Sequence, residues 1–207
     1  MLIDFLGDSI TEGAGASSVE NCFVERVGQL LNCKVINHGI GGTRFARQRK
    51  PSADPRWDLD FCSRLKDLDK NADLVFVFGG TNDYGHGDAP IGKREDNTPD
   101  TYYGACNYIV ENLLKTYKKD QIAFIIPLHR VNEQSPLGDG YKEPSLPLEG
   151  YTNILIEVLN KYQIQYVDFR KNFGKGEDNP LLSDGLHPND KGHDLLARLL
   201  VEYIKSK

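Results

Sequence analysis

Apolar positions along the chain follow two alternating patterns. Short continuous apolar runs, typical of strands buried on both faces of a parallel sheet, are separated by stretches with the three-to-four-residue spacing of amphipathic helices. The runs predict strands at residues 2–6, 34–37, 73–80, 121–128 and 164–169. The helical spacing predicts helices at residues 20–31, 57–68, 101–118, 150–161 and 190–205.

This alternation predicts an α/β fold in which a five-stranded parallel sheet lies between two layers of helices, as a three-layer α/β/α sandwich. Right-handed crossovers leave few doubly wound arrangements, and we expect the flavodoxin-like strand order 2-1-3-4-5. The 207 residues suit one domain, with no internal repeat or low-complexity linker to divide them. We therefore expect a single domain over residues 1–207.

Three predicted connections are unusually long, at residues 38–56, 83–100 and 128–149. Each follows the carboxyl end of a strand, and open parallel sheets bind ligands at this edge, where the strand order reverses. Connections of this length are usually functional. The functional site is therefore expected at this edge, although the fold alone does not name a function.

Polar segments follow four of the predicted strands, with the sequences GDS, NHGIGGTR, GGTND and SDGLHPND. The Ser9 hydroxyl is a weak nucleophile that needs a base. His187 can serve, because imidazole titrates near neutrality. Asp184 precedes His187 by three residues, a spacing that lets its carboxylate reach the other ring nitrogen and hold the tautomer. The pattern predicts a Ser9–His187–Asp184 catalytic triad.

Attack of a serine on an ester carbonyl produces an oxyanion, which needs preplaced hydrogen-bond donors. In the expected strand order, Ser9, the glycine turn and Asn82 share one edge of the sheet. A glycine in a tight loop offers an unobstructed N–H group, and both Gly41 and Gly42 qualify. The Asn82 amide and the Ser9 N–H complete the predicted oxyanion hole.

Each of these segments also has a purely structural explanation. Asp8 and Ser9 suit a turn or helix cap, and a glycine cluster suits backbone with positive φ. Asn82 is typical of turns, and the segment 187–189 suits the start of a helix with Asn189 as its cap. The coincidence of all four segments at the carboxyl ends of four strands favours the catalytic interpretation.

The same segments resemble the SGNH hydrolases, also called the GDSL family of esterases and lipases. The resemblance extends from Gly7 to Asn189, with the blocks in family order. GDSI resembles the first block, with Ile10 where leucine is frequent, GGTND resembles the G-x-N-D block, and DGLHP resembles the D-x-x-H block. The G-x-S-x-G elbow of the α/β-hydrolases is absent, which argues against that other serine-hydrolase fold.

This resemblance implies Ser9 as the nucleophile, His187 as the base and Asp184 as its partner. It also implies an oxyanion hole formed by the Ser9 N–H, the Gly42 N–H and Asn82. The second block is the loosest of the four. Family register selects Gly42, while the adjacent Gly41 stays open as the alternative donor.

Five further residues are candidates for substrate binding, namely Asp8, Arg44, Tyr84, His86 and His129. They lie in or beside the loops at the expected site edge, where ligand-binding residues concentrate. Arg44 belongs to an arginine-rich stretch that suits a polar or anionic leaving group. By contrast, Asp83 is expected to make structural hydrogen bonds, and His193 is expected to be solvated on the last helix.

The connections around the expected site are polar, whereas a long acyl chain would need an apolar groove. We therefore expect a serine ester hydrolase that acts through an acyl-enzyme on short-chain, acetyl-type esters of a polar or carbohydrate substrate. A lysophospholipase or acyl-thioesterase is the alternative. A flavodoxin-like phosphate- or nucleotide-binding module is the alternative from another class. That module needs no Asp184–His187 pair, and the first loop is not a P-loop.

Composition narrows the remaining possibilities. The formal net charge of −5 gives no reason to expect nucleic-acid binding. No apolar run approaches the roughly 20 residues of a membrane span, and no signal-peptide pattern opens the chain, so we expect a cytoplasmic protein. The cysteine spacing favours core thiols over a metal site or a disulfide, and no cofactor is expected. The four are Cys22, Cys33, Cys62 and Cys106.

Overall fold

The computed structural model describes residues 1–140, 142–143, 145–175 and 179–207. Within these residues, parallel strands form one sheet in the order β2-β1-β3-β4-β5. The strands are β1 (Leu2–Gly7), β2 (Lys34–Gly39), β3 (Leu74–Phe78), β4 (Ile122–Ile125) and β5 (Gln165–Val167). The predicted fold class and strand order are confirmed.

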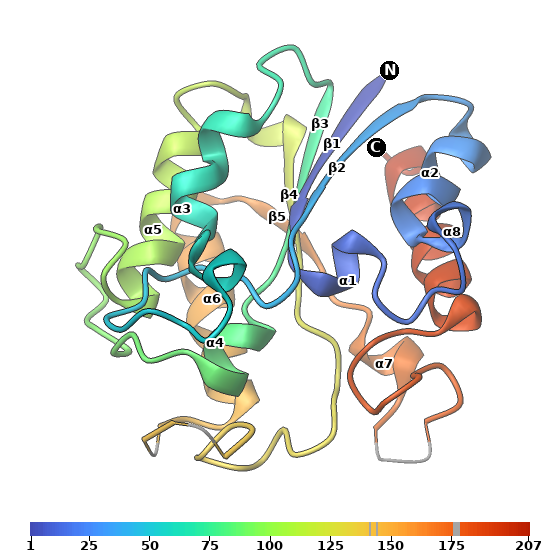
Figure 1. Cartoon of the computed structure of the whole chain (residues 1–207). Helices are drawn as coiled ribbons and strands as arrows, with labels where there is room; N and C mark the ends of the chain where they lie inside the picture. Colours follow the sequence, from blue (N-terminus) through green and yellow to red (C-terminus); the bar gives the residue numbers. More distant parts are fainter. Residues whose placement is uncertain (141, 144, 176–178) are drawn as a thin grey trace.

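Helices cover both faces of this sheet. Figure 1 shows α2 and α8 together on one face and α3, α5 and α6 on the other. The α-helices are α1 (Ser9–Glu12), α2 (Phe23–Leu31), α3 (Phe61–Arg64), α4 (Thr81–His86), α5 (Tyr102–Leu113), α6 (Leu148–Tyr162), α7 (Arg170–Phe173) and α8 (Asp190–Lys205). The 3-10 helices are η1 (Val19–Asn21), η2 (Pro55–Asp58), η3 (Leu65–Asp67) and η4 (Lys119–Gln121).

The central strand β3 explains why its sequence reads as a continuous apolar run. Successive side chains of a strand point to opposite faces of the sheet. Phe76 and Phe78 join the core under α2 and α8, whereas Val75 and Val77 join the core under α5 and α6. Because both faces are covered, every position of β3 must be apolar.

The chain leaves β1 for α1 in a turn that only glycine fits. A Cβ atom on Gly7 would lie 1.9 Å from Thr11 Oγ1, inside the first turn of α1. Asp8 then caps α1, because its side chain accepts the N–H of Ile10 at 3.0 Å. Ser9 therefore begins a helix directly at the edge of the sheet. This position fits both the structural and the catalytic interpretation of the GDS segment.

The predicted helix at 57–68 is wrong as a single element. The segment instead divides into η2, α3 and η3, because Asp60 has extended backbone and its side chain accepts the N–H of Ser63 at 2.8 Å. The helix α4 lies partly in a segment predicted as loop. Gly80, at φ 102°, turns the chain from β3 into α4, whose buried polar residues conceal any helical pattern.

His193 is buried, which corrects the expectation that it is solvated. Its Nδ1 accepts the N–H of Phe23 at 3.3 Å, and its Nε2 lies 3.1 Å from the carbonyl oxygen of Ala14. It therefore joins α8 to α2 and to the loop after α1. Cys22, Cys62 and Cys106 are buried as predicted, and all four cysteines are free thiols.

Candidate active site

Three of the predicted residues form one hydrogen-bonded series at the carboxyl edge of the sheet. Ser9 Oγ lies 2.9 Å from His187 Nε2, and His187 Nδ1 lies 2.7 Å from Asp184 Oδ2. The other carboxylate oxygen, Asp184 Oδ1, accepts the backbone N–H groups of Leu186 and His187 at 3.0 and 2.8 Å. The turn before α8 therefore holds the acid and the imidazole in fixed register.

The protonation of His187 follows from its partner. A carboxylate only accepts, so Nδ1 carries the proton and the lone pair of Nε2 faces Ser9 Oγ. Partial burial opposes ionisation of Asp184, but hydrogen bonds from the His187 N–H and ring and from the Leu186 N–H hold its pKa below the usual range. The acid stays charged, and the imidazole can take a proton from the serine.

Three N–H groups are predicted to form the oxyanion hole, and their hydrogen-bond partners show which of them are available. Ser9 is the first residue of α1, so its own N–H has no partner within the helix. Asn82 Nδ2 donates one hydrogen to the carbonyl of Thr43 at 3.0 Å, which leaves the second amide hydrogen to bind elsewhere. The third donor comes from the glycine turn after β2.

Contacts within the glycine turn distinguish its two candidate donors. The Gly41 N–H donates to Glu12 Oε2 at 2.8 Å and is therefore occupied. Among the described residues, the Gly42 N–H has no acceptor. A Cβ atom on Gly41 would lie 3.6 Å from the Ser9 Cβ, so the turn is adjacent to the serine. These contacts favour Gly42 as the available donor.

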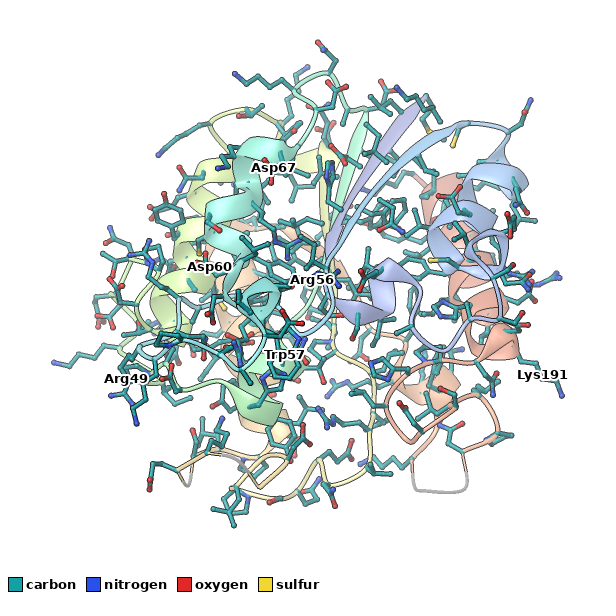
Figure 2. The ribbon with its side chains drawn as sticks, in the orientation of Figure 1. Arg49, Arg56, Trp57, Asp60, Asp67 and Lys191 are labelled. Atoms are coloured by element: carbon teal, nitrogen blue, oxygen red, sulfur yellow. The ribbon has the colours of Figure 1, made fainter. Side chains whose placement is uncertain are left out.

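Gly42 is required by its own geometry. Its φ is 76°, and a Cβ atom there would lie 2.2 Å from Cδ1 of Trp57. Trp57 belongs to η2, lies near α4 in Figure 2, and has its ring 5.1 Å from the ring of His86. The helical pattern placed Trp57 on the face of a predicted helix, which concealed this contact with the glycine turn.

Two buried ionic side chains hold the loops of the site together. Asp83 accepts the N–H groups of Phe45 and Ala46 at 2.8 and 3.0 Å, a structural role of the kind expected for it. Arg64 donates to the carbonyls of Gly7 and His38 at 3.1 and 2.7 Å, and so joins the ends of β1 and β2. Sequence reasoning missed Arg64, because nothing in its pattern distinguishes it from a surface arginine.

A buried acid lies next to Ser9 and another lies next to Asn82, and in both the ionised form is disfavoured by burial. Asp8 precedes the serine, and Asp83 follows the asparagine. Burial raises the pKa of Asp8 to about 6 and the pKa of Asp83 to about 6, in each case against the opposing effect of backbone N–H donors. The site is therefore assembled at some expense of stability near neutral pH.

The five predicted substrate-binding residues have different positions. Tyr84 is fully buried, and its hydroxyl donates to the carbonyls of Asn132 and Ser135, so it has no surface for a substrate. Asp8 is likewise buried as the cap of α1. His129 pairs with Glu133 at 2.8 Å beside a separate small cavity.

Arg44 and His86 are the two of these residues that line a cavity beside the glycine turn. The cavity measures about 600 Å³, and Trp57, which packs on Gly42, is part of its wall. Its lining consists of Arg44, Gln48, Lys50, Pro51, Ser52, Ala53, Trp57, His86, Asp88 and Asp139. A second cavity of about 500 Å³ shares Lys50 and Asp88 with it. Most of the residues that line the first cavity are polar or charged, but the surface that they present to it is mostly apolar.

The described residues contain no group of three or more His, Cys, Asp or Glu side chains arranged to hold a metal ion. None of the helices in this described part is both long and apolar enough to cross a membrane.

Comparison with solved structures agrees with the observed architecture. A protein from Lactobacillus plantarum is 24% identical with a TM-score of 0.80, over 99% of this chain and 96% of that one. The lipase/acylhydrolase from Enterococcus faecalis is 21% identical with a TM-score of 0.69, over 99% of this chain and 95% of that one. At these identities the likeness shows the fold alone.

The family comparison covers most of the chain. No curated protein matches it. The model of the GDSL-like lipase/acylhydrolase family matches residues 5–195, a range that contains every residue of the candidate triad and oxyanion hole. With its parallel sheet and with Ser9, Asn82 and His187 at one edge of that sheet, the chain belongs to the GDSL-like lipase/acylhydrolase family.

Proposed function

We propose that the protein is a serine ester hydrolase that works through an acyl-enzyme intermediate. The observation that carries the proposal is the continuous series from Asp184 through His187 to Ser9, with hydrogen bonds of 2.7 and 2.9 Å. This series gives a hydroxyl the base that it needs to become a nucleophile. Membership of a family of lipases and acylhydrolases supports the same reaction class.

In the proposed reaction, Ser9 Oγ attacks the ester carbonyl while its proton passes to His187 Nε2. The carbonyl oxygen becomes an oxyanion, which accepts hydrogen bonds from the N–H groups of Ser9 and Gly42 and from the Asn82 amide. His187 then returns the proton to the leaving alkoxide. Water, activated by the same imidazole, hydrolyses the acyl-enzyme and restores the serine.

We further propose a substrate with a short acyl group, of acetyl type, on a polar or carbohydrate leaving group. Charged side chains in the lining of the cavity beside the glycine turn, such as Arg44, Lys50 and Asp88, support a polar leaving group. The surface that these residues present to the cavity is mostly apolar, so an ester with a longer acyl chain is the competing substrate.

The reaction class is tested with a chromogenic acetyl ester and the variant Ser9→Ala. We expect Ser9→Ala to lower kcat by about 10⁴-fold or more, since only binding and the oxyanion donors remain. Ser206→Ala, an exposed serine at the end of α8, is the matched control and should keep full activity. Activity of Ser9→Ala within a few-fold of the wild type would reject the assignment.

The acyl preference is tested separately with a series of esters of increasing chain length and with acetylated sugars. A steep preference for acetyl supports the proposed substrate class. Rates that rise up to long chains would instead favour a lysophospholipase or thioesterase. If a fluorophosphonate fails to label Ser9 and a flavin or nucleotide copurifies tightly, the protein is a binding module of the flavodoxin type.

A further inference from the structure

The asparagine of the oxyanion hole has a histidine neighbour on the same helix. Asn82 and His86 are four residues apart in α4, so their side chains lie on one face. His86 Nε2 is 3.2 Å from Asn82 Oδ1, and His86 Nδ1 is 2.5 Å from Arg44 Nη2. At the other end, Asn82 Nδ2 donates to the carbonyl of Thr43. Arg44 and Thr43 are adjacent residues directly after Gly42, so this series of contacts begins and ends in the same glycine loop.

The two ends of this chain determine the direction of every hydrogen bond. A guanidinium only donates, so the Arg44 contact makes His86 Nδ1 an acceptor and leaves the proton on Nε2. A carbonyl only accepts, so the contact with the Thr43 oxygen identifies the nitrogen of the Asn82 amide. His86 Nε2–H must then donate to Asn82 Oδ1, and the two independent deductions agree.

Arg44 is well anchored for this task. It is 4% exposed, and its Nη1 donates to Ser52 Oγ at 2.8 Å and to the carbonyl of Trp57 at 3.3 Å. Asp58 lies 3.8 Å from the same nitrogen and balances its charge. The guanidinium therefore cannot turn away from His86 without breaking several contacts.

Burial and the surrounding charges keep His86 neutral. Burial has the largest effect, and with the charge of Arg44 it lowers the pKa of His86 to about 4. The charged groups that act on the ring are Arg44, Arg130, Lys142 and Asp139, of which only the last favours protonation. Above about pH 5, the ring is in the neutral form that the hydrogen-bond directions require.

We propose that His86, held by Arg44, is a positioning residue that keeps the amide nitrogen of Asn82 directed at the oxyanion. This inference rests on the proposed function and deepens it. If the amide rotated by 180°, its carbonyl oxygen would face the developing negative charge and repel it. His86 occupies that oxygen with a donor on one side, while Thr43 occupies the nitrogen on the other.

Two substitutions of His86 separate positioning from simple packing. A glutamine amide reaches the place of Nε2 and can still donate to Asn82, whereas an asparagine reaches only the place of Nδ1. We expect His86→Asn to lower kcat about 10- to 100-fold with little change in KM, because removing an oxyanion donor outright loses roughly 10²- to 10³-fold. We expect His86→Gln to stay within about threefold of the wild type.

A double-mutant cycle with Asn82→Ala is the second kinetic readout. Once the amide is absent, His86→Asn should lower kcat by no more than about twofold further, because its effect passes through that amide. Thermal unfolding of each variant checks that the fold is intact. Equal losses in His86→Asn and His86→Gln, no loss in His86→Asn, or an undiminished loss in the Asn82→Ala background would each overturn the proposal.

A third readout needs no turnover. In ¹⁵N NMR spectra of the wild-type protein, His86 should show a protonated Nε2 and an unprotonated Nδ1 from pH 5 to 8. The opposite tautomer would overturn the proposal. If the wild type proves to have no Ser9-dependent hydrolysis, the proposed function fails while this tautomer is still observed, so the two failures are distinguishable.

Discussion

The candidate site has two halves, a triad half with Ser9, His187 and Asp184 and a donor half with Asn82, His86 and Arg44. Each half contains a histidine between two polar partners, but the group beside Nδ1 is an acceptor in the first and a donor in the second. His187 lies between a carboxylate and a hydroxyl, so its Nε2 is free to accept a proton. His86 lies between a guanidinium and an amide oxygen, so its Nε2 donates. Because the Nδ1 neighbour is Asp184 in one case and Arg44 in the other, Nε2 of the same side chain accepts a hydrogen bond in the first and donates one in the second.

The halves differ in exposure as well. The side chain of Asp184 is 54% exposed and that of His187 is 22% exposed, and one short turn holds both. Asn82 and Arg44 are each 4% exposed, and they come from α4 after β3 and from the loop after β2. The proposed base is therefore oriented by a local turn in contact with water, while the proposed Asn82 donor is oriented by buried contacts distant in sequence.

Among the substitutions that test this comparison, Asp184→Asn in the triad half should have the largest effect on activity. The asparagine oxygen can still accept the N–H groups of Leu186 and His187, but its NH2 group would face His187 Nδ1 and favour the wrong tautomer. We expect kcat for an acetyl ester to fall about 10³- to 10⁴-fold with little loss of stability. Asp194→Asn is the control, and a loss of less than tenfold for Asp184→Asn would contradict the proposed role.

Asn82→Ala removes the amide of the donor half and should have the next largest effect on activity. We expect kcat to fall about 10²- to 10³-fold with KM nearly unchanged, because the lost hydrogen bond strengthens only in the transition state. The exposed Asn71→Ala is the matched control. A rise in KM without a change in kcat would instead assign Asn82 to binding of the ground-state substrate.

The glycine turn allows a finer test of the donor half. At Gly42, alanine would require positive φ and would meet the Trp57 ring, so we expect Gly42→Ala to lower the free energy of unfolding by about 2 kcal/mol and to reduce activity. At Gly41, the added Cβ comes too close only to the flexible end of Glu12 and makes an ordinary contact with Ser9, so Gly41→Ala should be milder in both respects. Denaturant unfolding measures the first effect, and equal losses would contradict this distinction.

The smallest effect on activity is expected at Asp8, the buried acid of the triad half, where the change is in stability. Because the pKa of Asp8 is raised on folding, the stability that its protonated form contributes is fully present at pH values below the usual pKa of an aspartate. This stability is lost as the pH rises through about 6. Asp8→Asn keeps the oxygen that accepts the Ile10 N–H and never ionises. It should therefore exceed the wild type by about 1 to 3 kcal/mol in unfolding free energy at pH 7 and match it below pH 4.

Asp83→Asn, in the donor half, should have the opposite sign at pH 7. Asp83 uses both oxygens to accept N–H groups, so one amide hydrogen of asparagine would face the N–H of Phe45 or Ala46. We expect a loss of about 1 to 3 kcal/mol in urea unfolding. Equal responses of the two variants would show that burial alone, and not hydrogen bonding, separates the two acids.

The apolar pattern predicted the parallel sheet, because Phe76 and Val77 are buried on opposite faces of β3 and leave an unbroken apolar run. The strand order came from the handedness of the crossovers. The pattern failed where capping overrides periodicity, as at Asp60, which divides one expected helix into three. The proposed triad could be predicted from the sequence because Asp184 and His187 are three positions apart and Ser9 closely follows β1. The link from Arg44 to His86 was not, since it depends on packing between loops distant in sequence.

The hydrogen bond between Ser9 and His187 joins residues 178 positions apart. His187 lies just before α8, so the hydrogen bond depends on the docking of α8 against α2, two helices from opposite ends of the chain. Any partly folded form that lacks α8 therefore has a serine without its base. Reaction of Ser9 with a fluorophosphonate then reports how much of the protein has completed folding, and the reagent becomes a quantitative probe of refolding.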